Sequence, residues 1–225
     1  FIGPDDLVVY PYPSYILYET LADIQGAKHE RLALNADWSW NHALARPIVE
    51  RSKLVFVPNP NSPSGNLWSD ADLQALIPPR GMLLSDGAYC DFADNPPGAQ
   101  LLQATEGKRV IITRTLSKSY SLAGIRFGFA VAHPDVIAGL RKVKDSYNCN
   151  TLTLAAAAAA LEDREWMRQN VEKIRATRVR LNAGLRGLGF HVVDSQANFV
   201  WATHPNQNHR EIYEFLKSRK ILVRY

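Results

Sequence analysis

Four short polar segments contain the residue types of this chain that could carry out chemistry. Three of them follow short apolar runs, residues 61–65, 85–89 and 113–120, and the fourth, residues 124–128, comes shortly after the third. Together they supply a lysine amine, a carboxylate, phenols, hydroxyls and a guanidinium. Taken singly, each segment is more simply explained as a turn, a helix cap or a solvated charge. Open α/β sheets bind their ligands beyond the carboxyl ends of their strands, so the order and spacing of the four segments together predict one shared site.

Other common catalytic patterns are absent from the sequence. It holds no G-x-x-x-x-G-K-[ST], no G-x-S-x-G and no H-E-x-x-H, and its six histidines are scattered. Cys90 and Cys149 are too far apart for a C-x-x-C pair. A P-loop, a serine hydrolase and a metal site therefore have little support, and no metal is expected. Two separated cysteines favour a reducing, cytoplasmic setting.

The elements that must position these segments alternate along the chain between apolar runs and amphipathic stretches. Helices are expected from residue 14 to 25 and, capped by Ser69 with Asp72, up to residue 77. Strands are expected at 7–10, 29–34, 54–57, 82–85, 110–113 and 127–132. This alternation predicts an α/β fold with three layers, in which helices cover both faces of a mainly parallel sheet.

The pattern changes at residue 152. Six consecutive alanines, followed by helical spacing of apolar residues up to 187, predict a connecting helix over 152–187 that could break at Glu162 and Asp163. Strands at 190–193, 199–202 and 221–223 around a helix at 210–219 then predict part of a smaller α+β domain. The expected organisation is a large domain at 1–151, the connecting helix at 152–187 and a small domain at 188–225. Because the chain opens without Met and stops in a predicted strand, both domains are expected to be incomplete.

Composition supports an ordinary globular protein. The 225 residues are 46% hydrophobic and 21% charged, which excludes a disordered chain and a coiled coil. The longest nearly apolar run, residues 152–161, is much shorter than the roughly 20 residues of a membrane-spanning helix, so no membrane crossing is expected. Net charge is +4, but 26 Lys and Arg are interleaved with 22 Asp and Glu, so nucleic acid is not an expected partner.

The joint pattern resembles the fold-type I, pyridoxal-phosphate-dependent aminotransferases, and most closely the histidinol-phosphate aminotransferases. The resemblance covers essentially the whole chain. Residues 13–15 resemble the family's P-T-Y, residues 61–65 its N-N-P-T-G and residues 86–89 its D-E-A-Y. Residues 115–128 resemble its T-L-S-K-x-(F/Y)-x-L-A-G-L-R-x-G, the most specific of these motifs. The resemblance implies the three-layer large domain of fold-type I transferases, pyridoxal 5'-phosphate as cofactor and a homodimer.

Three residues are the catalytic candidates that the resemblance implies. Lys118 would hold the aldehyde cofactor as a Schiff base and move the substrate proton. Asp86 would keep the ring nitrogen protonated, because a carboxylate at hydrogen-bond distance favours the charged form. Tyr89 would reach the phenolic oxygen of the ring.

Further residues would bind the cofactor. Tyr15 resembles the aromatic residue that stacks on the pyridine ring, with a plain core tyrosine as the alternative. The family's second Asn of N-N-P-T-G is Ser62 here, so either Asn61 replaces it or the contact is weaker. The phosphate needs several donors and a fixed positive charge, which the resemblance assigns to Thr115, Ser117 and Arg126.

Two residues are candidates for substrate binding and specificity. Asn198 resembles the Asn of the family's (S/T)-N-(F/Y), which helps to bind the substrate carboxylate. Arg224 resembles a position facing the phosphate of histidinol phosphate, but a strand-end arginine explains it equally well. Gly87 stands where the family has Glu.

The implied function is transamination of histidinol phosphate with 2-oxoglutarate in histidine biosynthesis, so the partners would be an amino acid and a 2-oxo acid. The alternatives are another fold-type I enzyme, such as an aromatic or broad-specificity aminotransferase or a phospho-amino-acid decarboxylase, or a truncated member that binds cofactor or a partner subunit without turnover.

Overall fold

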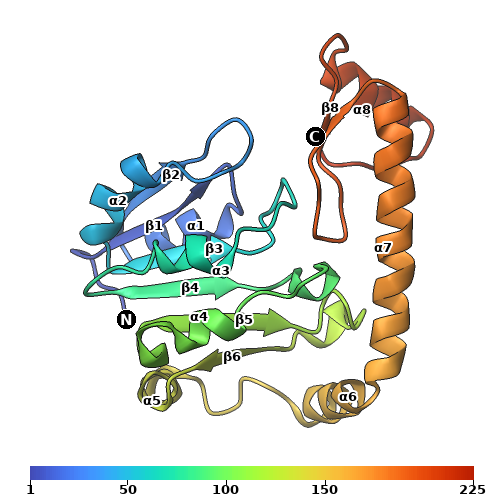
Figure 1. Cartoon of the computed structure of the whole chain (residues 1–225). Helices are drawn as coiled ribbons and strands as arrows, with labels where there is room; N and C mark the ends of the chain where they lie inside the picture. Colours follow the sequence, from blue (N-terminus) through green and yellow to red (C-terminus); the bar gives the residue numbers. More distant parts are fainter.

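A six-stranded sheet forms the centre of the molecule (Figure 1). The computed structural model describes the backbone of all 225 residues and the side chains of all but residues 99, 105 and 106. The strand order is β2-β1-β3-β4-β5-β6; the first five strands are parallel and β6 is antiparallel to β5. The strands are β1 (Leu7–Tyr12), β2 (Lys28–Ala33), β3 (Leu54–Pro58), β4 (Met82–Asp86), β5 (Val110–Thr115) and β6 (Gly128–Ala132). The predicted α/β fold with a mainly parallel sheet is confirmed.

Helices cross over between the parallel strands. They are α1 (Leu17–Ile24), α2 (His42–Glu50), α3 (Asp70–Gln74) and α4 (Ala99–Gln103), and α5 (Pro134–Val143) follows β6. The predicted cap of α3 is present, because the Ser69 side chain accepts from the Asp72 backbone N–H and Asp72 accepts from the Ser69 backbone N–H. Helix α1 begins three residues later than expected, since residues 13–16 form the turn that follows β1.

Successive residues of the strands enter two separate cores. On one face Val9, Val55 and Leu83 pack with residues of α2, α3 and α4, of which Leu73 is an example. On the other face Val8, Tyr10 and Phe56 pack with Tyr18 and Ala22 of α1. A strand buried on both faces reads as a continuous apolar run, which is why these strands could be predicted from the sequence.

Two helices carry the chain away from the sheet. Helix α6 (Thr151–Glu162) ends at Asp163, whose side chain accepts from the backbone N–H of Trp166 at 3.1 Å and so caps α7 (Arg164–Gly187). The break lies where the sequence predicted it. In Figure 1, α7 passes the carboxyl ends of β4 and β5 and leads to a small unit at the far end of the molecule. In the part of the chain that the structure describes, no helix is both long and apolar enough to span a membrane.

The small unit contains β7 (His191–Val192), β8 (Ala202–Thr203) and α8 (His209–Ser218). The strands expected at 190–193 and 199–202 are therefore shorter or shifted, because backbone groups between them bond to other parts of the protein; the Gln196 N–H, for example, donates to the Gly65 carbonyl. The prediction of a strand at 221–223 is wrong, because these residues form neither strand nor helix. The Ile221 N–H instead donates to the Leu216 carbonyl, which closes the end of α8.

Candidate active site

The carboxylate of Asp86 lies at the carboxyl end of β4 and accepts two hydrogen bonds. The Tyr18 hydroxyl donates to Oδ2 at 2.9 Å, and the Ala88 backbone N–H donates to Oδ1 at 3.1 Å. Tyr18 is buried and stacks on Phe56, with ring centroids 4.7 Å apart and planes at 11°. Burial, followed by the Asp86 charge, raises the pKa of Tyr18 well above its usual value, so this phenol remains a donor. Asp86 is therefore held in a fixed orientation.

The Lys118 amine lies beside the ring of Tyr89. Its Nζ is 5.3 Å from the ring centroid, and the lysine side chain is exposed. On another side, Tyr89 makes an edge-on contact with Phe199, with centroids 4.9 Å apart. Tyr89 thus joins a residue of the loop after β5 to a residue of the small unit.

A hydrogen bond that sequence reasoning missed fixes the Lys118 loop. Ser119 is 2% exposed, and its hydroxyl donates to Oδ2 of Asp91 at 2.5 Å. Asp91 lies in the short 3₁₀ turn Cys90–Phe92, directly after Tyr89. The bond ties the loop that carries Lys118 to the turn that follows Tyr89. Only a fold that brings these two segments together reveals the pair.

The hydroxyls of Thr115 and Ser117 and the segment that carries the Arg126 guanidinium meet where β5 and β6 pair. The Thr115 hydroxyl accepts from the Ser117 backbone N–H at 3.1 Å and lies 3.0 Å from the Ser117 hydroxyl. Thr115 pairs with Gly128 across the ladder, which brings the segment of Arg126 alongside. Arg126 has a left-handed backbone, with φ of 56°, and its guanidinium donates to the Ala123 carbonyl at 2.9 Å. Such a group of donors can bind an anion.

Asn61 and Tyr15 lie on the other side of Asp86. The Asn61 side chain is buried; its amide donates to the Ser64 hydroxyl at 2.7 Å and to the Pro13 carbonyl at 3.4 Å. It therefore ties the 61–65 turn to the segment after β1. Tyr15 is 45% exposed and packs edge-on against Tyr18, with centroids 5.8 Å apart.

Two glycines of the predicted motifs make room for neighbouring groups. At Gly87 a Cβ would overlap the guanidinium of Arg114, which donates to the Pro97 carbonyl at 3.1 Å, so the family's Glu would displace this arginine. At Gly65, where φ is +80°, a Cβ would lie 2.8 Å from Cβ of Ser195. The close approach of the 195–199 loop to Gly65 is a second contact that sequence reasoning missed.

The two substrate-binding candidates lie in the small unit. Asn198 is exposed in the 195–199 loop, between Ala197 and the Phe199 that contacts Tyr89. Arg224 is exposed in the segment after α8. Contacts with shared neighbours thus bring five of the candidates to the edge of the sheet where the parallel strands end: Lys118, Asp86, Tyr89, Tyr15 and Asn198. Arg224 has no such link among the described contacts.

Residues 1–225 match the family described as aminotransferase class I and II. The chain belongs to this family. Histidinol-phosphate aminotransferases of Rhodopirellula baltica and Syntrophotalea carbinolica are 49% and 43% identical over 100% of this chain, which covers 61% and 63% of them. The chain therefore spans about three fifths of these relatives.

Solved structures of the family share the fold. A crystal structure of histidinol-phosphate aminotransferase from Sinorhizobium meliloti, in complex with pyridoxal-5'-phosphate, matches with a TM-score of 0.87 and 26% identity. The match covers 99% of this chain and 62% of that one. The fold-type I architecture implied by the sequence motifs is confirmed.

Proposed function

We propose that this protein is a pyridoxal-phosphate-dependent aminotransferase that exchanges the amino group of histidinol phosphate with 2-oxoglutarate in histidine biosynthesis. The observation that carries the proposal is the doubly hydrogen-bonded Asp86 carboxylate at the same sheet edge as the Lys118 amine and the donors of Thr115, Ser117 and Arg126. The similarity to curated histidinol-phosphate aminotransferases supports the choice of substrate.

The donor set fits pyridoxal phosphate. Its phosphate suits the hydroxyls of Thr115 and Ser117 with the Arg126 guanidinium, and its protonated ring nitrogen suits the Asp86 carboxylate. When bound, the cofactor supplies an aldehyde for amine exchange and an electron sink for loss of the substrate α-proton.

The side chains of this chain would then have distinct tasks. Lys118 would hold the cofactor through its amine, and the same amine would carry the proton at the substrate α-carbon. Asp86, oriented by Tyr18, keeps the ring nitrogen charged. Tyr89 would contact the ring oxygen and Tyr15 would stack on the ring. Asn61 would support cofactor binding by holding the 61–65 turn, which its amide stabilises.

Substrate contacts follow from the small unit. Asn198 would bind the carboxylate that the amino donor and the 2-oxo acid share, and Arg224 the phosphate of histidinol phosphate. The proposal also includes a homodimer in the cytoplasm. Exposed apolar residues of α1, with Ile16 and Ile24 at its ends, support a surface for the partner subunit. The free thiols of Cys90 and Cys149 support the reducing cytoplasm.

Borohydride reduction of the holoenzyme, followed by peptide mapping, tests the assignment of Lys118. The pyridoxyl label should be found on Lys118 and should be absent from a Lys118→Arg variant. A label on Lys142 instead would contradict the site.

A single half-reaction tests the substrate. Histidinol phosphate alone should convert the bound cofactor to its amine form, seen as loss of the visible absorbance, and 2-oxoglutarate should restore it. Conversion by aromatic amino acids but not by histidinol phosphate would favour an aromatic aminotransferase.

A further inference from the structure

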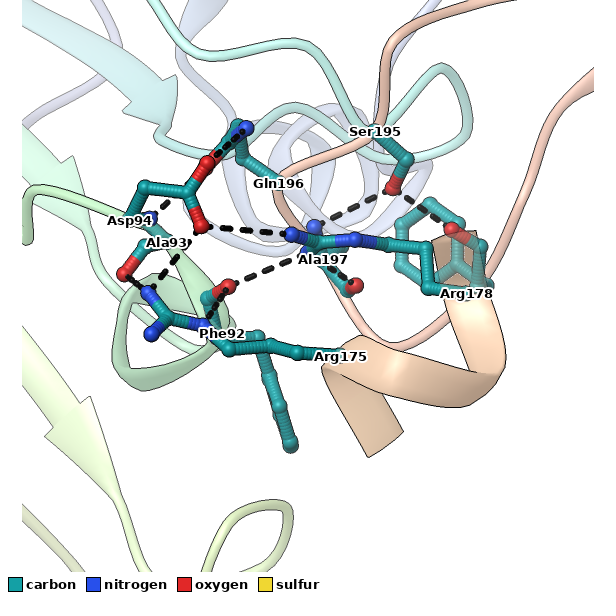
Figure 2. Close-up of polar contacts among 9 residues, drawn as sticks. Phe92, Ala93, Asp94, Arg175, Arg178, Ser195, Gln196 and Ala197 are labelled. Atoms are coloured by element: carbon teal, nitrogen blue, oxygen red, sulfur yellow. Dashed lines mark hydrogen bonds and ion pairs between the residues drawn. The ribbon is translucent and has the colours of Figure 1, made fainter. Parts of the chain in front are cut away.

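Arg178 of α7 connects two parts of the chain that are distant in sequence. Its side chain is 7% exposed, and one guanidinium nitrogen, Nη1, donates to the Phe92 carbonyl at 3.0 Å and to the Ala197 carbonyl at 2.9 Å (Figure 2). Phe92 ends the 3₁₀ turn after β4, whereas Ala197 lies in the 195–199 loop of the small unit. A single guanidinium therefore holds the loop against the large unit, which is the part of the chain built around the six-stranded sheet.

Arg175 and Asp94 extend this contact into a network. Arg175 donates through Nε to the Phe92 carbonyl at 3.1 Å and through Nη2 to the Ala93 carbonyl. Oδ1 of Asp94 faces both guanidinia, at 3.3 Å from Arg175 and 3.7 Å from Arg178. Gln196 completes the network, because its amide donates to Oδ2 of Asp94 at 3.1 Å and its Oε1 accepts from the Asp94 backbone N–H at 2.7 Å.

Burying the charged guanidinium of Arg178 costs free energy, and packing of the side chain alone does not offset that cost. Burial lowers the pKa of Arg178, while the Asp94 charge opposes that effect. A buried guanidinium is retained at low cost only where its donors are used, and here they satisfy two carbonyls whose residues are fully or almost fully buried. Lysine would keep the charge but lacks the planar fork that can reach both carbonyls and Asp94.

The loop that Arg178 holds carries residues of the site. Asn198 directly follows Ala197, and Phe199 packs on Tyr89, the ring that also lies beside the Lys118 amine. The Gln196 N–H, in turn, donates to the Gly65 carbonyl at 2.7 Å. A shift of the Ala197 carbonyl would therefore move Asn198 while leaving Asp86 and Thr115 on their strands and Ser117 in the loop after β5.

We infer that Arg178 is a positioning residue: through the Ala197 carbonyl it fixes Asn198 where the carboxylate of the amino acid and of the 2-oxo acid binds. The inference rests on the proposed function. It assigns Arg175, Asp94 and Gln196 to the same task, which is to hold the 195–199 loop in register with the sheet edge.

Steady-state kinetics of the holoenzyme with an Arg178→Lys variant test the inference. KM for both histidinol phosphate and 2-oxoglutarate should rise about tenfold, since a displaced Asn198 loses its hydrogen bond to the charged substrate carboxylate. The value of kcat should change by less than about threefold. The visible absorbance of the bound cofactor and its pH dependence should stay the same, because the Phe92 carbonyl keeps its hydrogen bond from Arg175 Nε and the turn after Tyr89 is therefore still held. Arg180→Lys, at an exposed position of the same helix, is the matched control and should leave both KM values unchanged.

A second variant approaches the network from the loop, in case Arg178→Lys does not fold. Gln196→Ala leaves α7 intact and removes the side-chain bonds to Asp94, so it should raise the same two KM values. In an Asn198→Ala background, either change should add less than about twofold, because its effect passes through Asn198.

Two outcomes would overturn the inference: unchanged KM values in both variants, or losses that simply multiply with those of Asn198→Ala. A wild-type protein that binds cofactor but does not transaminate would instead contradict the proposed function. The two failures are thus distinguishable.

Discussion

At the scale of single residues, Asp86 illustrates how a strand end positions a charged group. Its carboxylate accepts from Tyr18 and from the Ala88 N–H, so its orientation does not depend on a ligand. Asp86→Asn keeps the size and an acceptor oxygen but removes the charge that favours a protonated ring nitrogen. We expect cofactor to remain bound through the phosphate donors, while the half-reaction slows about 100-fold or more in stopped-flow absorbance. Asp5→Asn, an exposed carboxylate near the start of the chain, is the control, and wild-type rates in Asp86→Asn would remove this residue from the mechanism.

Arg224 provides a residue-scale test of specificity. If its guanidinium binds the substrate phosphate, the charge-assisted contact contributes about 1.5–3 kcal/mol. Arg224→Ala should then raise KM for histidinol phosphate about tenfold or more, and an unphosphorylated donor should be nearly unaffected. Comparison of the two donors is the measurement, because general damage to the small unit would affect both. Equal losses would make Arg224 structural and would favour a broad-specificity aminotransferase.

The sequence could indicate the motif residues but not their supporting contacts. Asp86 and Lys118 lie in polar segments that follow apolar runs, and Arg126 belongs to the same motif as Lys118, so a local pattern was enough to propose all three. Ser119 with Asp91, and Arg178 with Ala197, meet only through the tertiary fold. A buried arginine in a helix rich in charged residues has no local signal that separates it from its exposed neighbours.

At the scale of elements, prediction worked where burial imposes a continuous apolar pattern. Strand β3 is buried throughout and β5 over its first three residues, and both were expected within two residues of their ends. The apolar run Ile221 to Val223 has the same composition but is exposed, and Ile221 bonds back to the end of α8. A strand needs a ladder partner as well as a pattern, and only the fold decides whether one is present.

Gly65 supports an element-scale prediction about the 61–65 turn. Its φ of +80° disfavours any side chain, and a Cβ there would press against Ser195. Gly65→Ala should therefore lower the free energy of unfolding by about 1–3 kcal/mol in urea titration. Ser195→Gly relieves the contact but also removes the hydroxyl that bonds to Phe199 and Ala197, so it should cost less free energy in the Gly65→Ala protein than in the wild type. Gly124→Ala, where a Cβ would meet open space, is the control; equal effects at both glycines would contradict the argument.

At the scale of the whole molecule, α7 and the 195–199 loop connect the small unit to the sheet. Three kinds of contact meet there: the Arg178 carbonyl bonds, the Gln196 bond to Gly65, and the packing of Phe199 on Tyr89. Substrate and cofactor groups would thus come from two units whose relative position is set by these polar contacts and by one aromatic contact. This arrangement explains why the local sequence of either unit does not describe the site.

Buried weak acids make the stability of the whole molecule depend on alkaline pH. Burial, followed by the Asp91 charge, raises the pKa of Cys90 to about 12; burial and the hydrogen bond to Glu19 raise that of Tyr10 to about 12; and Tyr18 is also raised. Above pH 9 the unfolded chain releases protons that the folded chain retains, so the free energy of unfolding should fall between pH 9 and 12. Below pH 9 the contribution of these acids to stability is fully present.

Urea unfolding at pH 8 to 11.5, with reductant present, measures this dependence. Tyr10→Phe removes one of the three acids, so its stability should fall less steeply with pH above 10 than that of the wild type, whatever its stability at pH 8. Tyr147→Phe changes an exposed phenol and serves as the control, since its slope should match the wild type. If the stability of Tyr10→Phe falls with pH as steeply as that of the wild type and of Tyr147→Phe, the Tyr10 proton is not held more tightly in the folded protein.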